Sequence, residues 1–152
     1  MNTQNYSQEI KQTLENKFKL SALSIVQFPH EKYKVQTSVD FSIEHKNITY
    51  LFDIESYNTP KVALANYVLL NNYMSNHAEI MFVNIQCAKG FNTSRTVDHL
   101  NFAQRKFGCK VPFKVFDGIT FQAMVLQSRS LDGLMIKINA KVKPIKILLE
   151  SL

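Results

Sequence analysis

An alternating stretch between residues 39 and 55, VDFSIEHKNITYLFDIE, constrains the fold more than any other part of this sequence. Apolar and polar side chains alternate on either side of Lys46 and Asn47, as is typical of half-buried strands. Asn tolerates the positive φ that a two-residue turn requires. The stretch therefore predicts a tight β-hairpin with Lys46 and Asn47 at its tip.

The register of this hairpin follows from its tip. The predicted cross-strand pairs are His45 with Ile48, Ile43 with Tyr50, Phe41 with Phe52, and Val39 with Ile54. The last three pairs are apolar and would share one buried face. The other face would place Asp40 directly opposite Asp53, with Glu55 two positions further on. A one-residue slip would spoil the apolar pairs, so the buried face supports a register that brings three carboxylates together.

Carboxylates held this close need an explanation. Like charges directly opposite each other destabilise a sheet, and burial raises the pKa of at least one of them. A divalent cation would compensate, since Mg²⁺ prefers oxygen ligands and binds one or two carboxylates together with water and phosphate. The alternative is that Asp40, Asp53 and Glu55 are solvated acids on an exposed strand face with no function. The residues alone leave both interpretations open.

Helices and strands alternate along the rest of the chain. Ser7 is a candidate N-cap for the first helix, Thr59 and Pro60 mark the start of the second, and Gly108 marks the end of the third. The run EIMFVNIQC is apolar enough for a central strand covered on both faces. Beyond the hairpin, the patterns predict helices over 7–18, 60–74, 97–107 and 119–129, and strands over 22–28, 79–87, 111–116 and 134–143.

Two groups of cations are candidates for contact with phosphates. In the predicted strand 134–143, alternation would align Lys137, Lys141 and Lys143 along the open face. The same lysines would also protect an edge strand against aggregation. Lys89 and Arg95 flank the start of the third helix, where a phosphate could bind, although the segment also fits an ordinary loop.

Composition limits the class of protein. The chain has 152 residues, 45% of them hydrophobic, which fits one domain spanning 1–152. Its net charge of +6 favours an anionic partner, with nucleic acid ahead of membrane. We expect a cytoplasmic protein, because no apolar run is long enough to span a bilayer and the N-terminus lacks signal-peptide features. Cys87 and Cys109 lack metal-ligand spacing, so buried free thiols are expected.

The order helix, three strands, helix, strand, with acids on the second and third strands, resembles the PD-(D/E)xK nuclease superfamily over about residues 7–90. This resemblance implies an α/β (α+β) fold with a restriction endonuclease-like αβββαβ core, in which helices flank a mixed central sheet, followed here by C-terminal β/α additions. It also implies that Asp40, Asp53 and the main-chain carbonyl of Ile54 ligate Mg²⁺ or Mn²⁺.

The sequence departs from the family pattern at three positions. Val39 replaces the nominal proline, Asp53 replaces the commoner glutamate, and Glu55 stands where the family usually has a catalytic lysine. Some type II restriction endonucleases of the superfamily carry glutamate there, so the resemblance implies that Glu55 is a third ligand or a base. By the same resemblance, Lys61 is a candidate for a displaced lysine and Glu15 for an additional acid. Both also fit exposed positions on amphipathic helices.

The resemblance implies metal-dependent hydrolysis of nucleic acid, with DNA endonuclease activity favoured. The missing lysine favours an alternative, a catalytically inactive relative that binds DNA or protein. A structural protein of unrelated fold is a third hypothesis. Because the domain is small, either a homodimer or a partner protein that supplies targeting is expected.

Overall fold

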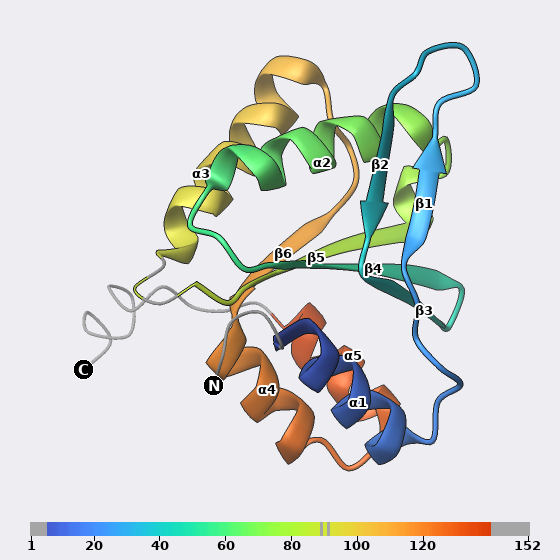
Figure 1. Ribbon diagram of the computed structural model, residues 1–152, viewed down its shortest axis with the longest axis vertical. Helices are drawn as coiled ribbons and strands as arrows, with labels where there is room; N and C mark the ends of the chain where they lie inside the picture. Colours follow the sequence, from blue (N-terminus) through green and yellow to red (C-terminus); the bar gives the residue numbers. More distant parts are fainter. Residues whose placement is uncertain (1–5, 89, 91, 141–152) are drawn as a thin grey trace.

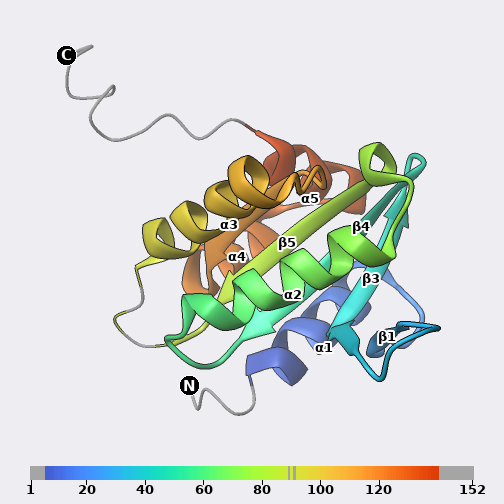
Figure 2. The same cartoon turned by 90° about the horizontal axis from the view of Figure 1, so that it is seen from above.

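The computed structural model describes residues 6–88, 90 and 92–140, which form a mixed α/β fold. A four-stranded sheet lies between two layers of helices, with α2 and α3 on one face and α1, α4 and α5 on the other (Figure 1). The view from above shows α2 and α3 side by side over the sheet (Figure 2). The helices are α1 (Tyr6–Phe18), α2 (Pro60–Tyr73), α3 (Thr93–Phe107), α4 (Gly118–Gln127) and α5 (Leu131–Asn139), with a short 3-10 helix, η2 (His77–Glu79).

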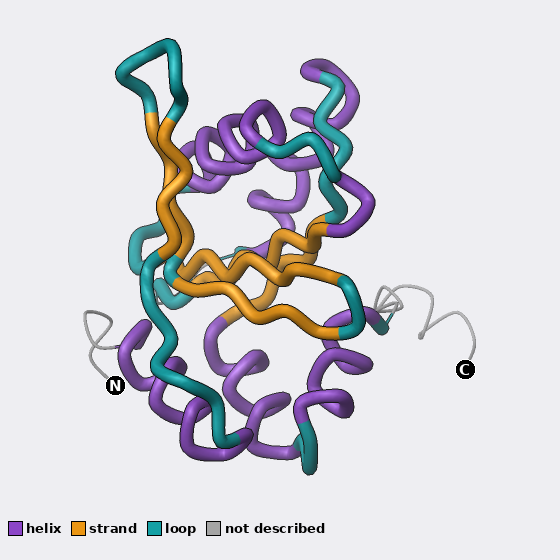
Figure 3. The backbone as a smooth tube through the Cα atoms, turned by 90° about the vertical axis from the view of Figure 1, so that its right-hand side faces the viewer, coloured by secondary structure: helices purple, strands orange, loops and turns teal. Residues whose placement is uncertain are grey.

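The strands form two separate sheets. A two-stranded antiparallel ribbon contains β1 and β2 and projects from the body of the protein (Figure 3). The main sheet has the order β3-β4-β5-β6, in which β3 and β4 are antiparallel and the other neighbours are parallel. The carboxyl ends of β4, β5 and β6 therefore meet at one edge. The strands are β1 (Val26–Pro29), β2 (Gln36–Val39), β3 (Phe41–His45), β4 (Ile48–Glu55), β5 (Ile80–Gln86) and β6 (Phe113–Asp117).

The β3–β4 hairpin confirms most of the predicted register. Lys46 and Asn47 form its tip with φ of 50° and 66°, as a two-residue turn with two left-handed residues requires. Three of the four predicted pairs are present: His45 with Ile48, Ile43 with Tyr50, and Phe41 with Phe52.

The fourth predicted pair, Val39 with Ile54, is wrong. Asp40 forms a bend between β2 and β3, and β2 turns away to pair with β1, so that Val39 lies opposite Val26. Val39 packs in the core beneath α2, whereas Ile54 packs in the core on the other face of the sheet. Because Val39 is buried beneath α2 while Phe41 is buried on the opposite face, the chain has to bend at Asp40, where it leaves the β3–β4 ladder. Asp40 still donates its backbone N–H to the Phe52 carbonyl at 2.9 Å, but it is not paired with Asp53 in the ladder.

The two faces of the sheet bury different cores. Phe52 and Ile85 belong to the core shared with α1, α4 and α5. Leu51 and Phe82 belong to the core shared with α2 and α3. Because side chains alternate along a strand, Asp53 and Glu55 lie on the same face as Leu51, toward α2.

Local signals placed most of the helix ends correctly. Pro60 occupies the first turn of α2, although Thr59 makes no side-chain capping bond. α3 ends at Gly108, whose φ of 68° is the left-handed conformation expected at this position. Ser7 is not the N-cap of the first helix, because α1 already includes Tyr6. The predicted buried strand over EIMFVNIQC is β5, which lies between β4 and β6.

The predicted C-terminal strand 134–143 is wrong over the residues described. Leu131–Asn139 is the helix α5, whose N-cap Ser130 accepts a hydrogen bond from the Gly133 backbone N–H at 3.0 Å. Leu134 and Ile138 are four residues apart, so the same sequence that alternates also draws an apolar stripe on a helix. Lys137 therefore lies on a helix and does not begin a row of strand lysines, while Lys141 and Lys143 lie outside the described residues.

Cys87 and Cys109 are buried free thiols, as predicted. Over residues 6–140, leaving out 89 and 91, no helix is both long and apolar enough to cross a membrane.

Candidate functional site

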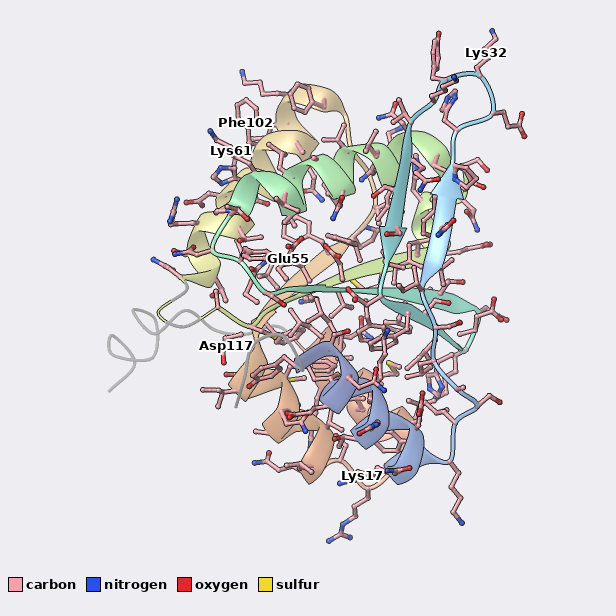
Figure 4. All side chains as sticks on the ribbon, in the orientation of Figure 1. Lys17, Lys32, Glu55, Lys61, Phe102 and Asp117 are labelled. Carbon is pink, nitrogen blue, oxygen red and sulfur yellow. The ribbon has the colours of Figure 1, made fainter. Side chains whose placement is uncertain are left out.

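Three carboxylates gather where β4 ends. Asp53 and Glu55 lie on the face of β4 beneath α2 and are only 5% and 7% exposed. Glu55 is the last residue of the strand, at the edge where the parallel strands end (Figure 4). Asp40, half-buried at the bend before β3, is close enough for its charge to raise the pKa of both.

Asp40 links the bend to β4 and to α1. Its Oδ2 accepts a hydrogen bond from the Ile54 backbone N–H at 2.7 Å, and its Oδ1 accepts one from the Ser7 hydroxyl at 3.1 Å. Because the N–H and C=O of one strand residue point the same way, the Ile54 carbonyl faces the edge of β4 on which Asp40 lies. The structure therefore brings Asp40 and Ile54 together, through a bend and not through the predicted cross-strand pairing.

Asp53 is held by buried amides. Its Oδ2 accepts hydrogen bonds from Asn84 Nδ2 on β5 at 3.2 Å and from Asn66 Nδ2 on α2 at 3.4 Å. Gln86 Nε2 donates to Asn84 Oδ1, and Thr37 Oγ1 on β2 donates to Asn66 Oδ1 at 3.1 Å. This polar layer connects Asp53 to the neighbouring strand, to α2 and to the projecting ribbon.

Glu55 is less well satisfied. It lies beside Gln86 in the β4–β5 register, and its Oε1 is buried without a hydrogen-bond partner in the described part of the chain. An unpaired buried polar atom costs about 1–3 kcal/mol. The Oε1 atom is therefore available to a further hydrogen bond or to a bound ion.

The pKa values of Asp53 and Glu55 are both raised, and that of Glu55 is raised more. Burial raises the pKa of Asp53 to about 6, and the negative charge of Asp40 adds to the increase, although hydrogen bonds from Glu55, Asn66 and Asn84 oppose it. Burial raises the pKa of Glu55 further, to about 8, assisted by the charge of Asp53 and by the hydrogen bond between the two side chains. No described lysine or arginine contributes to either shift.

The chemistry of these residues fits a divalent cation. Carboxylate and carbonyl oxygens are the ligands of Mg²⁺ and Mn²⁺, and a cation would offset both the burial and the mutual repulsion that raise the two pKa values. The side chains are not arranged as a finished site, because no three His, Cys, Asp or Glu residues among those described are grouped to hold a metal ion. Asp53 and Glu55 would have to turn toward Asp40 to share one. The oxygens of Asp40 keep lone pairs for a further contact.

Lys61 lies away from the carboxylates. It lines a groove with His99 and Phe102, and Figure 4 shows it beside Phe102 on the outer side of α2, away from Glu55 on the sheet. Asn66, five residues later, faces Asp53, and five residues turn a helix by roughly 140° relative to the starting position. The structure therefore does not bring Lys61 to the position that the missing lysine would occupy.

The other predicted residues also lie apart from the site. Glu15 is near the far end of α1, where its Oε1 accepts a hydrogen bond from the Leu23 backbone N–H at 2.7 Å. Arg95 is exposed in the first turn of α3, and Lys137 is half-buried on α5. Lys89 lies outside the described residues.

Asn84, Gln86 and Ser7 contribute to the site but were not predicted from the sequence. Asn84 and Gln86 could have been found, because they interrupt an apolar strand at alternate positions, as Asp53 and Glu55 do on β4. The contact between Ser7 and Asp40 joins residues 33 apart and has no local signal.

A scan against protein-family models, a search of curated proteins and a search of solved structures each found no match. Function is therefore inferred from the arrangement of this chain's own residues.

Proposed function

We propose that this protein hydrolyses phosphodiester bonds of nucleic acid with the help of Mg²⁺ or Mn²⁺, and that DNA is its favoured substrate. The observation that carries this proposal is the group formed by the buried Asp53 and Glu55 at the carboxyl end of β4 and the half-buried Asp40 beside them, in which two pKa values are raised and one oxygen has no described partner. Strongly shifted pKa values at the ends of parallel strands are typical of functional sites.

The order of elements supports the proposal. If β2 and β3 are taken as one strand bent at Asp40, the chain runs through a helix, three strands, a helix and a further strand, as in the PD-(D/E)xK superfamily. Asp40 then lies on the second strand, and Asp53 and Glu55 lie on the third. Beyond this core, β6 extends the sheet, and α3, α4 and α5 complete the two helical layers.

Each residue has a distinct role in this proposal. Asp40, Asp53 and the carbonyl of Ile54 would hold the cation, which lowers the pKa of a bound water and stabilises negative charge on the phosphate. Asn66 and Asn84 keep the Asp53 carboxylate oriented. Without metal, burial and the neighbouring acids raise the pKa of Glu55 to about 8. Beside a bound cation it would be ionised and could accept a proton from water.

A second candidate function is nucleic-acid binding without catalysis. It is favoured by one observation: no lysine in the described part of the chain hydrogen-bonds to Asp53 or Glu55 or shifts the pKa of either. The usual residue for activating water is therefore not found beside these acids among the described residues. For this candidate, binding should persist in EDTA and in Asp40→Ala.

The two candidates are separated by a cleavage assay. Supercoiled, linear, branched and single-stranded DNA, and RNA, are incubated with the protein and Mg²⁺ or Mn²⁺. We expect cleavage that EDTA and Asp53→Asn abolish. Asp132→Asn is the matched control, because Asp132 is a surface acid paired with Lys46 at 2.7 Å and lies outside the site. Absence of cleavage of every substrate, or equal cleavage by Asp53→Asn, would contradict the proposal.

A further inference from the structure

A groove between α2 and α3 lies on the outer side of the helices that cover the candidate site. It has a volume of about 600 Å³, and its lining is Lys61 and Leu64 from α2 with Asp98, His99 and Phe102 from α3. None of these residues contacts the three carboxylates. The groove is therefore a separate surface whose occupant has to be argued from its own chemistry.

The groove displays an aromatic ring to solvent. Phe102 is 49% exposed in the middle of α3, and its ring packs edge to face against Phe107, with 5.7 Å between the ring centroids. Phe107 is itself 59% exposed. The edge-to-face contact with Phe107 orients the Phe102 ring. About half of the Phe102 side chain stays exposed, so a second flat group could stack on it.

Cations on α2 and α3 flank this ring, and one acid, Asp98, lies one turn before it on α3. Arg95, Phe102 and Lys106 are spaced at seven and four residues, so they lie along one face of α3, and Lys61 faces them from α2. Asp98 is the acid among the groove-lining residues. His99 is oriented by its Nδ1, which donates a hydrogen bond to the Arg95 carbonyl at 2.6 Å, so that Nε2 of the neutral ring is left as an acceptor.

The helices that line the groove also lead to the candidate site. α2 follows β4 and α3 follows β5, and these strands are parallel, so both helices begin at the edge of the sheet where Glu55 lies. Tyr57, which is 75% exposed, stands in the loop between Glu55 and α2. An extended polymer in the groove could therefore pass Tyr57 and reach the carboxylates.

We propose that the α2–α3 groove binds an unpaired segment of nucleic acid, with a base stacked on Phe102 and phosphates next to Lys61 and Arg95. Aromatic rings flanked by cations are the features by which proteins bind single strands without reading sequence. A paired base in a duplex has both faces covered by its neighbours, so stacking on Phe102 requires an unpaired base. This inference deepens the proposed function and rests on it, because a path from the groove to Glu55 matters only if the carboxylates cleave nucleic acid. It assigns single-stranded or frayed nucleic acid as the substrate class.

Binding is tested in EDTA, so that no cleavage occurs. Fluorescence anisotropy measures the affinity of the protein for a labelled oligo-dT strand and for a duplex of the same length. Phe102→Ala should weaken binding to the single strand by about 5-fold or more, the loss expected for one stacked base. Lys61→Ala should reduce the slope of log affinity against log salt by about 0.7, the value for one phosphate contact on a single strand.

Two further variants and one control separate stacking from general apolar contact. Phe102→Trp keeps a ring and should retain affinity, whereas Phe102→Leu keeps apolar bulk and should lose it. Ile119→Ala, at a residue 78% exposed on α4 beyond the other face of the sheet, should bind like the native protein. Equal affinity of Phe102→Ala and the native protein, or equal dependence of duplex binding on Phe102, would overturn the inference. Self-association that depends on Phe102, without oligonucleotide binding, would show that the groove holds a second copy.

The same variants distinguish this inference from the proposed function. Binding that depends on Phe102, without cleavage by the native protein in Mg²⁺ or Mn²⁺, would retain the groove and refute the nuclease. Cleavage that depends on Asp53, with no effect of Phe102→Ala on binding, would retain the nuclease and refute the groove.

Discussion

Glu55 should dominate the pH dependence of folding stability when no metal is bound. Its surroundings raise its pKa from an ordinary value of 4.5 to about 8. Between these two values the native state holds a proton that the unfolded state has released. The contribution of Glu55 to stability is therefore complete below the unfolded pKa and is lost as the pH rises through the folded one.

The size of this effect follows from the shift. A group with pKa values of about 8 in the native state and 4.5 in the unfolded state lowers the free energy of unfolding by about 2–3 kcal/mol between about pH 6 and pH 9. Asp53, with a pKa raised to about 6, changes stability in the same direction, mostly below this range.

Urea denaturation in EDTA across this pH range measures the effect. Glu55→Gln preserves the shape of the side chain and a donor toward Asp53 but does not titrate. We expect the native protein to lose stability from pH 6 to pH 9 and the variant to change much less, so that the variant is the more stable at high pH. Asp132→Asn should retain the native slope. A native protein whose stability is as flat as that of Glu55→Gln would refute the reasoning.

Three further substitutions test other parts of the structure by the same denaturation assay. Asn84→Ala removes a donor to the buried Asp53 and should cost about 1–3 kcal/mol near pH 8, with a smaller cost at low pH, where Asp53 is neutral; a cost that does not vary with pH would contradict this role. Ser130→Ala removes the N-cap of α5 and should cost about 1 kcal/mol; no loss would argue against that helix. Gly118→Ala would place a Cβ 2.9 Å from Cys87 Sγ and should cost about 1–3 kcal/mol through overpacking; unchanged stability would contradict the close approach.

Local chemistry determined what could be predicted from the sequence. The hairpin tip at Lys46 and Asn47, the start of α2 at Pro60 and the end of α3 at Gly108 all depend on residues within a few positions of one another. The acids were recognised because Asp53 and Glu55 alternate with apolar residues on one strand. These signals need no knowledge of distant segments.

The errors came from competition between distant segments. Val39 would extend the β3–β4 ladder, but β1 offers it a different partner and α2 covers it, so the chain bends at Asp40. In α5, Leu134 and Ile138 satisfy both a strand pattern and a helix pattern, and the capping bond of Ser130 together with the core beneath the sheet selects the helix. The bend at Asp40 cannot be read from its own segment, whereas Ser130 is a local helix signal that the alternating pattern outweighed in the prediction.

The most direct test of the candidate site is calorimetric titration of the protein with Mn²⁺ near pH 7. Saturable binding is expected in the native protein and in Asp132→Asn but not in Asp53→Asn. Because Glu55 is mostly protonated at this pH without metal, a cation held beside it should displace its proton and release about one proton per ion, which is measured by repeating the titration in buffers of different ionisation enthalpy. Absence of binding, or identical binding by Asp53→Asn, would contradict a cation held by Asp40, Asp53 and the Ile54 carbonyl.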